Sequence, residues 1–287
     1  MIMKETDVMP GKSAEESLDP EDWESMRMLG HRILDDMMDY LETLRDRPAW
    51  QHAPVDVKAH FAGSPPVIPQ TPEEIYQEFT RYILPYQIGN NHPRFWGWVA
   101  GTGTVMGMFA ELISAATDAV SGSFSYLSNN YVEMQVLDWC KTMLGYPATA
   151  SGLITSGCSA SNLIGLAVAR NAKAQFDLRS KGMRAAPQLM TLYCSEEAHS
   201  SIQKAVELLG FGSRALRRVP VNESMQIDLE SLKEAIKTDR EGGYHPICVV
   251  GVAGTTNTGA IDDLEALAEI CSKEGLWLHV DGAFGAW

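Results

Sequence analysis

The side chains best suited to chemistry lie in four short segments that each follow an apolar run. The first, residues 155–162 (Thr-Ser-Gly-Cys-Ser-Ala-Ser-Asn), follows residues 152–154 and opens a helical pattern. Small residues at a helix start leave backbone N–H groups open to an anion, and the helix dipole adds partial positive charge. The segment predicts a phosphate site, although it matches neither a P-loop nor G-x-G-x-x-G, and a serine-rich helix cap is the alternative.

Two further segments offer a ring and several hydroxyl groups. In residues 195–201 (Ser-Glu-Glu-Ala-His-Ser-Ser), His199 could stack on a flat ligand or transfer a proton near neutral pH. The plainer interpretation of His199 is a solvated or capping histidine. Residues 254–259 (Gly-Thr-Thr-Asn-Thr-Gly) follow the most apolar run of the chain and could contact a ligand or form an ordinary turn.

The fourth segment, residues 278–284 (Leu-His-Val-Asp-Gly-Ala-Phe), carries a carboxylate at the end of an apolar run. Burying Asp281 there is costly unless a cation lies beside it. A protonated ring nitrogen is such a cation, and an aspartate that keeps the pyridinium of pyridoxal 5'-phosphate (PLP) charged lets the ring act as an electron sink. A surface carboxylate is the alternative if the segment is considered alone.

Alternating strand-like and helical patterns must position these segments. Short apolar runs alternate with amphipathic stretches from residue 151 onward, which predicts βαβ units and a mostly parallel sheet covered on both faces. Ligands bind at the carboxyl ends of the strands in such sheets, where the candidate residues lie. The predicted strands are residues 189–194, 215–221, 247–253 and 276–280, and the predicted helices are residues 200–209, 229–237 and 263–273.

The first hundred residues have a different character. Residues 22–47 carry apolar side chains at helical spacing and predict a long amphipathic helix. Thr71 followed by Pro72 predicts the start of a short helix. Residues 90–107 place Phe95, Trp96 and Trp98 among glycines. This pattern is equally consistent with two structures: the wall of a pocket or interface, and a packed loop without a binding role.

The composition and charge of the chain limit the classes of partner that it is expected to bind. The 287-residue chain has a formal net charge of −14, with 37 acidic against 23 basic residues. Such a chain repels nucleic acid, and its one basic cluster, Arg214, Arg217 and Arg218, lies among strand-like residues. The longest apolar run, residues 247–254, is too short to cross a bilayer. Neither a nucleic acid nor a membrane is therefore an expected partner.

Cysteine usage and the N-terminus bear on the cellular compartment. The five cysteines are odd in number and form no C-x-x-C pair, which indicates reduced thiols rather than disulfides or a metal site. Residues 1–20 are polar and acidic and have no apolar stretch of the kind that a signal peptide needs. We therefore expect a cytoplasmic protein without a metal.

The candidate segments together resemble a known family. Their residue types, order and spacing are similar to those of the group II PLP-dependent decarboxylases, which include aromatic-L-amino-acid, histidine, tyrosine and glutamate decarboxylases. The resemblance covers nearly all of the chain after residue 20. The matching motifs are residues 92–95 (His-Pro-Arg-Phe), 155–163 (Thr-Ser-Gly-Cys-Ser-Ala-Ser-Asn-Leu), 197–201 (Glu-Ala-His-Ser-Ser), 254–256 (Gly-Thr-Thr) and 277–281 (Trp-Leu-His-Val-Asp).

The resemblance implies an α/β fold of PLP fold-type I (aspartate aminotransferase-like), with a mostly parallel seven-stranded sheet and active sites shared in a homodimer. It divides the chain into a polar tail (1–20), a helical dimerisation segment (21–104) and an incomplete PLP-binding large domain (105–287). It also implies roles for individual residues. Cys158 and Ser159 would contact the phosphate, His199 would stack on the ring, Thr256 would contact the cofactor, Asp281 would pair with the ring nitrogen and Ala283 would pack under the ring. Trp98, Val99, Ala100 and Gly101 would line the substrate pocket.

The chain also departs from the family pattern. The resemblance places the lysine that forms the Schiff base with PLP beyond Trp287, together with the mobile catalytic loop and the C-terminal small domain. We therefore expect this chain to be truncated and, by itself, to bind PLP weakly and not to turn over. Gly282 and Phe284 stand where the aromatic amino-acid decarboxylases usually have alanine and tyrosine, which puts an aromatic substrate in doubt.

The expected function is decarboxylation of an L-amino acid to its amine and CO2. An aldehyde synthase, an aminotransferase or a carbon–carbon lyase of the same fold type is the alternative within enzymes. A non-catalytic homologue that serves only in binding or dimerisation is the alternative outside them.

Overall fold

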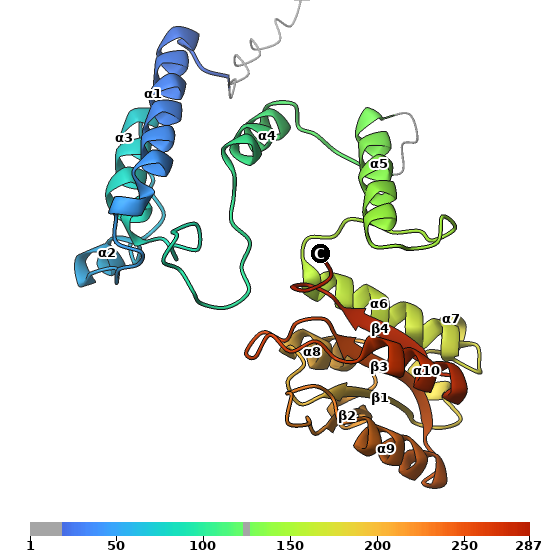
Figure 1. Cartoon of the computed structure of the whole chain (residues 1–287). Helices are drawn as coiled ribbons and strands as arrows, with labels where there is room; N and C mark the ends of the chain where they lie inside the picture. The colour runs from blue at the N-terminus through green and yellow to red at the C-terminus, as the bar shows by residue number, and fades with distance from the viewer. Residues whose placement is uncertain (1–18, 123–126) are drawn as a thin grey trace, which may run out of the picture. The chain divides into compact units, whose positions relative to one another are not determined.

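The chain divides into two units, residues 1–112 and 113–287 (Figure 1). The computed structural model describes residues 19–122 and 127–287, so most of the polar tail predicted for residues 1–20 lies outside the described residues. None of the described helices combines the length and the apolar character that a bilayer crossing requires.

The first unit begins with the long helix that the sequence predicts. Helix α1 spans Trp23–Glu42, and a 3-10 turn at Leu44–Asp46 follows it. Asp22 caps the helix, because its side chain accepts hydrogen bonds from the backbone N–H groups of Glu24 and Ser25. The predicted helix over residues 22–47 is thus confirmed for its first twenty residues, and its last turn is tighter than an α-helix.

Short helices complete the first unit. The Thr71 and Glu74 side chains form a capping box at the start of α3, which confirms the predicted helix start. Helix α3 is joined to α1 by the Tyr76 hydroxyl, which donates to the Asp36 carboxylate at 2.6 Å. The remaining elements are α2 (Val55–His60), α3 (Pro72–Glu78), a π-helical turn (Phe79–Ile83), a 3-10 turn (Leu84–Tyr86) and α4 (Val105–Ala116), which extends past the boundary between the units.

The second unit alternates helices and strands, as the sequence predicts. Each predicted strand and helix from residue 189 onward is present, with ends that shift by a few residues. The elements are α5 (Ser128–Met143), α6 (Cys158–Lys173), α7 (Leu178–Lys181), a 3-10 turn (Met183–Ala185), β1 (Met190–Ser195), α8 (Ser200–Leu208), a 3-10 turn (Ser213–Ala215), β2 (Leu216–Val219), α9 (Leu229–Glu241), β3 (His245–Val252), α10 (Leu264–Glu274) and β4 (Trp277–Asp281).

The strands form one parallel sheet in the order β2-β1-β3-β4, which confirms the predicted α/β class. The described sheet has four strands, and the seven implied by the resemblance remain a prediction. The apolar run at residues 152–154, unlike the runs that precede the other three candidate segments, forms no strand in the described chain. A strand needs a hydrogen-bonded neighbour, and none of the four strands pairs with this segment. Leu153 and Ile154 are accordingly more than half exposed.

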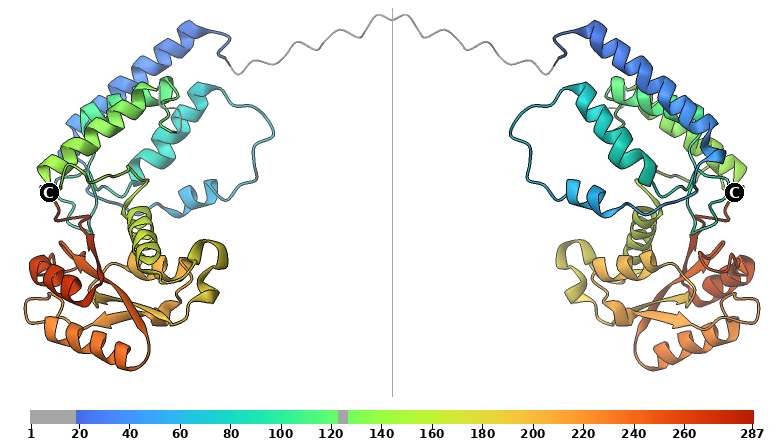
Figure 2. Two further views of the ribbon diagram at one scale, coloured as in Figure 1. Left: turned by 90° about the vertical axis from the view of Figure 1, so that its right-hand side faces the viewer. Right: turned by 90° about the vertical axis from the view of Figure 1, so that its left-hand side faces the viewer.

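Helices cover both faces of the sheet (Figure 2). On one face, buried residues of α6 and α8 such as Leu166 and Ile202 pack against Leu192 of β1. On the other face, buried residues of α9 and α10 such as Leu232 and Leu267 form a second cluster. Because side chains alternate along a strand, each strand supplies both clusters, and the parallel sheet is buried from both sides.

Helix α6 lies unusually close to β4. A Cβ atom at Gly165 would lie 2.5 Å from Cε1 and 2.7 Å from Nδ1 of His279. The His279 ring is also held by a 2.8 Å hydrogen bond to Asn162, so it is not free to turn away. The absence of a side chain at Gly165 therefore sets the distance between the helix and the strand.

The Gly165→Ala substitution tests this packing. In an open helix interior the change would stabilise the fold by about 1 kcal/mol, because alanine is the better helix former. Here the added methyl group must displace His279, and we expect the free energy of unfolding to fall by about 1–3 kcal/mol. Urea unfolding followed by circular dichroism measures the change. The control is Gly30→Ala on α1, where an added Cβ meets nothing within 4 Å and no loss is expected; equal losses in both variants would contradict the argument.

Candidate functional site

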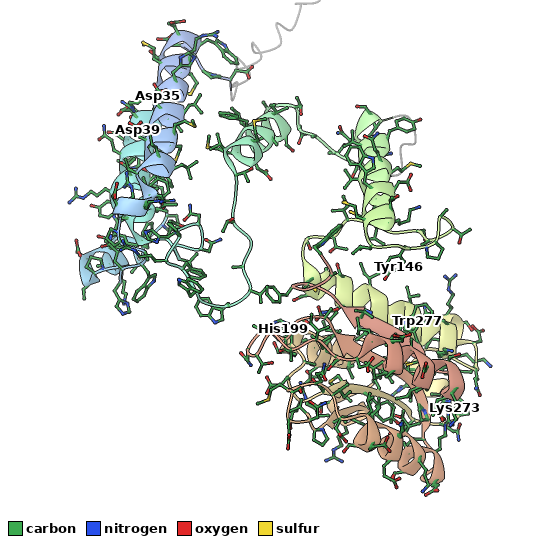
Figure 3. All side chains as sticks on the ribbon, in the orientation of Figure 1. Asp35, Asp39, Tyr146, His199, Lys273 and Trp277 are labelled. Atoms are coloured by element: carbon green, nitrogen blue, oxygen red, sulfur yellow. The ribbon has the colours of Figure 1, made fainter. Side chains whose placement is uncertain are left out.

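Three strand ends and the start of one helix meet at the carboxyl edge of the sheet in the second unit. His199 and Thr256 lie in the segments that follow β1 and β3, Asp281 is the last residue of β4, and α6 begins at Cys158. Figure 3 shows His199 at the start of α8, next to this edge. The structure thus brings the four predicted segments together: hydrogen bonds link three of them, as described below, and the remaining one, which begins at Gly254, lies against Phe284.

The start of α6 is open to an anion. Gly157 precedes the helix with a φ of 151°, and no side chain of the described residues caps the first turn. The first turn contains no acidic residue, and Cys158 and Ser159 are exposed. The first N–H groups of this 16-residue helix therefore remain available to a phosphate, as the sequence predicts. The proposed phosphate contacts of Cys158 and Ser159 themselves stay predictions.

Asp281 is a buried carboxylate at the end of β4, with an exposed fraction of 5%. Its Oδ2 accepts a 2.9 Å hydrogen bond from the Asn162 amide, and its Oδ1 accepts one of 3.2 Å from the backbone N–H of Ala283. None of the ion pairs among the described residues involves Asp281. A buried negative charge that has hydrogen-bond donors but no cation is suited to a cationic ligand.

The thiol of Cys158 lies against this carboxylate. Its Sγ is 3.4 Å from Oδ1 of Asp281, which brings the start of α6 and the end of β4 together. Although Cys158 as a whole residue is exposed, the partial burial of its thiol, followed by the charge of Asp281 and the hydrogen bond to it, raises the pKa of the thiol to about 11. Cys158 is therefore a neutral hydrogen-bond donor at physiological pH and not a thiolate nucleophile.

His199 caps helix α8. Its Nδ1 accepts a hydrogen bond of 3.2 Å from the backbone N–H of Ser201, and the Ser201 hydroxyl lies 2.8 Å from the same nitrogen. An Nδ1 that accepts from an N–H carries no hydrogen, so the neutral ring bears its hydrogen on Nε2. The capping interpretation of His199 is thus confirmed, and its exposed ring leaves the stacking role as a prediction.

One buried amide links these groups, and sequence reasoning missed it. Asn162 is 2% exposed, and its Nδ2 donates to Oδ2 of Asp281 and to the Ser201 hydroxyl at 3.0 Å. Its Oδ1 lies 2.8 Å from Nε2 of His279. Two spacings could have indicated this cluster: Asn162 follows Cys158 by one helical turn, and His279 precedes Asp281 by two strand positions, so each pair shares a face.

The loop after β3 is fixed by its own hydrogen bonds. Gly254 has a φ of 92°, a conformation that favours glycine, and the hydroxyls of Thr255 and Thr258 lie 2.5 Å apart. The buried Asp262 carboxylate holds the strand end by accepting from the backbone N–H of Val252. Thr256 is half-buried, and no hydrogen bond among the described residues joins it to Asp281, so its contact with a cofactor stays a prediction.

The remaining predicted residues are exposed. The Ala283 side chain is exposed beside Asp281, while its backbone N–H contributes to the site. Trp98, Val99, Ala100 and Gly101 belong to the first unit and are exposed, and Trp98 has a φ of 55°, which is uncommon for a residue with a side chain. Their role in a substrate pocket remains a prediction.

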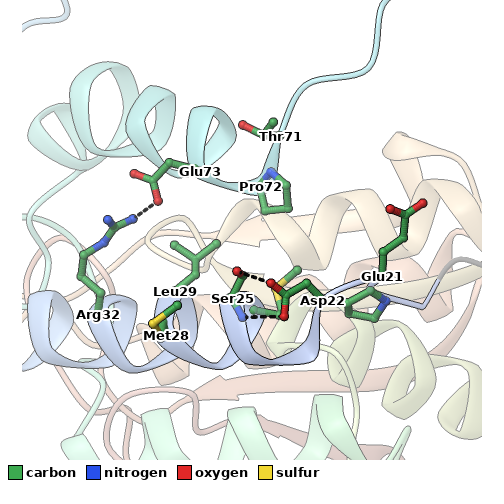
Figure 4. Close-up of a pocket in the computed structure, with 11 residues that line it drawn as sticks. Glu21, Asp22, Ser25, Met28, Leu29, Arg32, Thr71, Pro72 and Glu73 are labelled. Carbon is green, nitrogen blue, oxygen red and sulfur yellow. Dashed lines mark hydrogen bonds and ion pairs between the residues drawn. The ribbon is translucent and has the colours of Figure 1, made fainter.

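The first unit also holds a groove of about 690 Å³ between α1 and the start of α3 (Figure 4). Its walls include Met26, Met28 and Leu29, and Arg32 and Glu73 on it form an ion pair with each other. None of the predicted site residues lines the groove. It offers apolar surface rather than reactive groups.

Metal ligation is a separate possibility for a site rich in polar side chains. Across residues 19–122 and 127–287, no three His, Cys, Asp or Glu side chains are grouped so that they could hold a metal ion.

Alkylation of Cys158 tests its contact with Asp281. In Asp281→Asn the carboxylate charge is lost, so the pKa of the thiol falls and the thiolate fraction rises. We expect iodoacetamide at about pH 8 to label Cys158 about three- to tenfold faster than in the unchanged chain. Peptide mass spectrometry measures the rate, with Cys140 on α5 as an internal reference. The Asp239→Asn variant, which alters a buried carboxylate on the opposite face of the sheet, should leave the rate unchanged; an unchanged rate in Asp281→Asn would show that the contact is absent.

Comparison with known proteins places this geometry in a family. The pyridoxal-dependent decarboxylase conserved domain matches residues 54–286. An aromatic-L-amino-acid decarboxylase from Bacillus atrophaeus is 32% identical over 265 residues, which cover 92% of this chain and 53% of that protein. A phenylacetaldehyde synthase from Arabidopsis thaliana is also 32% identical, with 93% of this chain and 56% of that protein covered. The chain thus spans about half the length of the curated relatives it matches.

Solved structures agree in fold. The structure of mouse CSAD superimposes with a TM-score of 0.82 at 26% identity, covering 92% of this chain and 56% of that one. The tryptophan decarboxylase of Catharanthus roseus in complex with L-tryptophan gives a TM-score of 0.83 at 25% identity, covering 94% and 59%. With a domain match over most of its length and an α/β parallel sheet in common with these structures, the chain belongs to the pyridoxal-dependent decarboxylase family.

Proposed function

We propose that the protein decarboxylates an L-amino acid to the corresponding amine and CO2, with PLP as its cofactor. The observation that carries the proposal is the buried Asp281 carboxylate, which lies beside the open start of α6 and lacks a cation among the described residues. The cofactor named in the family's description supports it.

The residues present fit this cofactor in charge. PLP carries a phosphate dianion and, when its ring nitrogen is protonated, a cation. The helix start offers uncapped N–H groups for the anion, and Asp281 offers a negative charge for the cation. The two lie together, because the thiol of Cys158 in the first turn is 3.4 Å from Asp281. The site is therefore complementary to both charged ends of the cofactor.

Each predicted residue has a distinct task in this reaction. When bound, PLP supplies an electron sink for the electrons released as the substrate carboxylate leaves as CO2. Asp281 would hold a proton on the ring nitrogen, while Cys158 and Ser159 would orient the phosphate. His199 would cover one face of the ring, and Thr256 and Ala283 would limit its movement. Trp98, Val99, Ala100 and Gly101 would contact the substrate side chain.

Aldehyde formation is a second candidate, because one of the similar proteins is a phenylacetaldehyde synthase. In that reaction the loss of CO2 is followed by oxidation of the amine carbon, in which O2 accepts two electrons and water supplies the aldehyde oxygen, so the products are CO2, aldehyde, ammonia and hydrogen peroxide. The same cofactor contacts serve both reactions, and product analysis separates them.

We infer further that the protein acts as a homodimer in the cytoplasm. Helix α1 exposes large apolar side chains, with Trp23 at 63% and Met28 at 60% exposure, which suits a surface covered by a partner. The five cysteines are free thiols, as expected in a reducing compartment.

Product analysis of the gene product at its natural length tests the proposed reaction. The protein is supplied with PLP and a panel of L-amino acids, and CO2, amine, aldehyde and hydrogen peroxide are measured. We expect equal amounts of CO2 and amine from one substrate class. Aldehyde with peroxide would establish the second candidate, and failure to release CO2 from any substrate would contradict both.

The Asp281→Asn variant tests the residue at the centre of the proposal. An amide cannot balance a protonated ring nitrogen, so we expect the turnover rate to fall by at least about 100-fold. The control is Asp239→Asn, which alters a carboxylate of similar burial (6% exposed) that pairs with Arg217 outside the site. Steady-state CO2 release measures both variants, and a similar loss in both would indicate general destabilisation instead of a role for Asp281.

A further inference from the structure

The amide of Asn162 is surrounded by three polar side chains from two other elements, α8 and β4. Asp281 ends β4, Ser201 lies in the first turn of α8, and His279 lies on β4. Asn162 itself projects from the second turn of α6 and is 2% exposed. A side chain buried among so many polar groups is stable only if each donor meets an acceptor.

The chemistry of its neighbours fixes the orientation of this amide. The two hydrogens of Nδ2 point to the Asp281 carboxylate at 2.9 Å and to the Ser201 hydroxyl at 3.0 Å. Turning the amide over would place its oxygen against the carboxylate oxygen, where two acceptors would repel. In the orientation present, Oδ1 accepts from Nε2–H of His279. Burial lowers the pKa of His279, which keeps that ring neutral and in its donor role.

The same contacts restrict the Asp281 carboxylate. Its Oδ2 is held by Asn162, while its Oδ1 receives only the longer contacts from Ala283 N–H at 3.2 Å and Cys158 Sγ at 3.4 Å. The hydrogen bond from the Asn162 amide is thus the shortest of these three contacts to the carboxylate. Because Asn162 is anchored on a helix, it limits rotation of the carboxylate relative to the sheet.

We infer that Asn162 is a positioning residue that holds the Asp281 carboxylate in the orientation in which it meets the ring nitrogen of PLP. The inference rests on the proposed function, and it assigns to Asn162 a role that acts through Asp281 and not by contact with the substrate. A residue with this role must matter for a ligand that has the ring nitrogen and must not matter for one that lacks it.

That distinction defines the experiment. The ligands are PLP and 1-deazapyridoxal 5'-phosphate, in which a C–H group replaces the ring nitrogen. Their dissociation constants are measured by fluorescence titration of the cofactor-free gene product at its natural length and of its variants. In the unchanged chain we expect PLP to bind at least about tenfold more tightly than the analogue, because only PLP can pair with a buried carboxylate. In Asn162→Leu, which has a similar volume, we expect this preference to fall to about that of Asp281→Asn.

Two control variants separate positioning from a general loss of structure. Ser201→Ala removes the other acceptor of the same amide and leaves the contact to Asp281, so the preference for PLP should persist. Tyr193→Phe removes a buried hydroxyl that donates to Asp239 on the opposite face of the sheet, and it should also leave the preference unchanged. If Asn162 had only a structural role, Asn162→Leu would weaken the binding of both ligands by the same factor.

The outcomes are distinct. A preference for PLP that is lost in Asn162→Leu and retained in both controls supports the inference. A preference retained in Asn162→Leu overturns the inference and leaves the proposed function standing. A wild-type chain that binds neither ligand, or binds both equally, overturns the proposed pairing of Asp281 with the cofactor and the inference with it.

Discussion

The carboxylate of Asp281 is the constraint around which the site is arranged. A charge that is 5% exposed at a strand end requires donors or a cation, and the described chain supplies an amide, a backbone N–H and a thiol but no cation. The start of helix α6 lies beside Asp281 and carries partial positive charge. In the described part of the chain its first N–H groups do not pair with Asp281 and are open to an anionic group of a ligand. The site thus presents two unlike charges close together, which is the pattern that a small zwitterionic ligand would satisfy.

The fold supplies this arrangement through close packing. Parallel strands end at one edge of the sheet, so residues far apart in the sequence, such as Cys158 and Asp281, come within 3.4 Å. Alternation along β4 turns His279 and Asp281 to the same face, and Gly165 lets α6 approach that face without a side chain between them. The position of Asn162 depends on this approach. The close packing of α6 on β4 is therefore also what allows the buried polar groups of Asn162, His279 and Asp281 to form their hydrogen bonds.

Sequence patterns predicted the strands and helices more successfully than they predicted the contacts between side chains. The alternation of apolar runs was enough for four strands and their helices, because each run reports burial that the parallel sheet requires. Residues 152–154 have a similar apolar character but pair with no described strand, and local composition cannot supply a neighbour. Asp281 and His199 stood out because a carboxylate is costly to bury and an imidazole can stack on a ligand or transfer a proton. Asn162 and Ser201 did not, since their role depends on the meeting of α6, α8 and β4, which no single segment records.

The division of the chain bears on how substrate choice could vary. The proteins that this chain resembles are named for different substrates, among them L-2,4-diaminobutyrate and histidine. A family that shares one cofactor must place the selection of the amino-acid side chain outside the cofactor contacts. In this chain the groups proposed to hold PLP all belong to the second unit, whereas Trp98 to Gly101 belong to the first. The residues proposed to contact the substrate and the residues that hydrogen-bond Asp281 therefore share no member, so the proposed function lets the aromatic segment change while every hydrogen bond to Asp281 is kept.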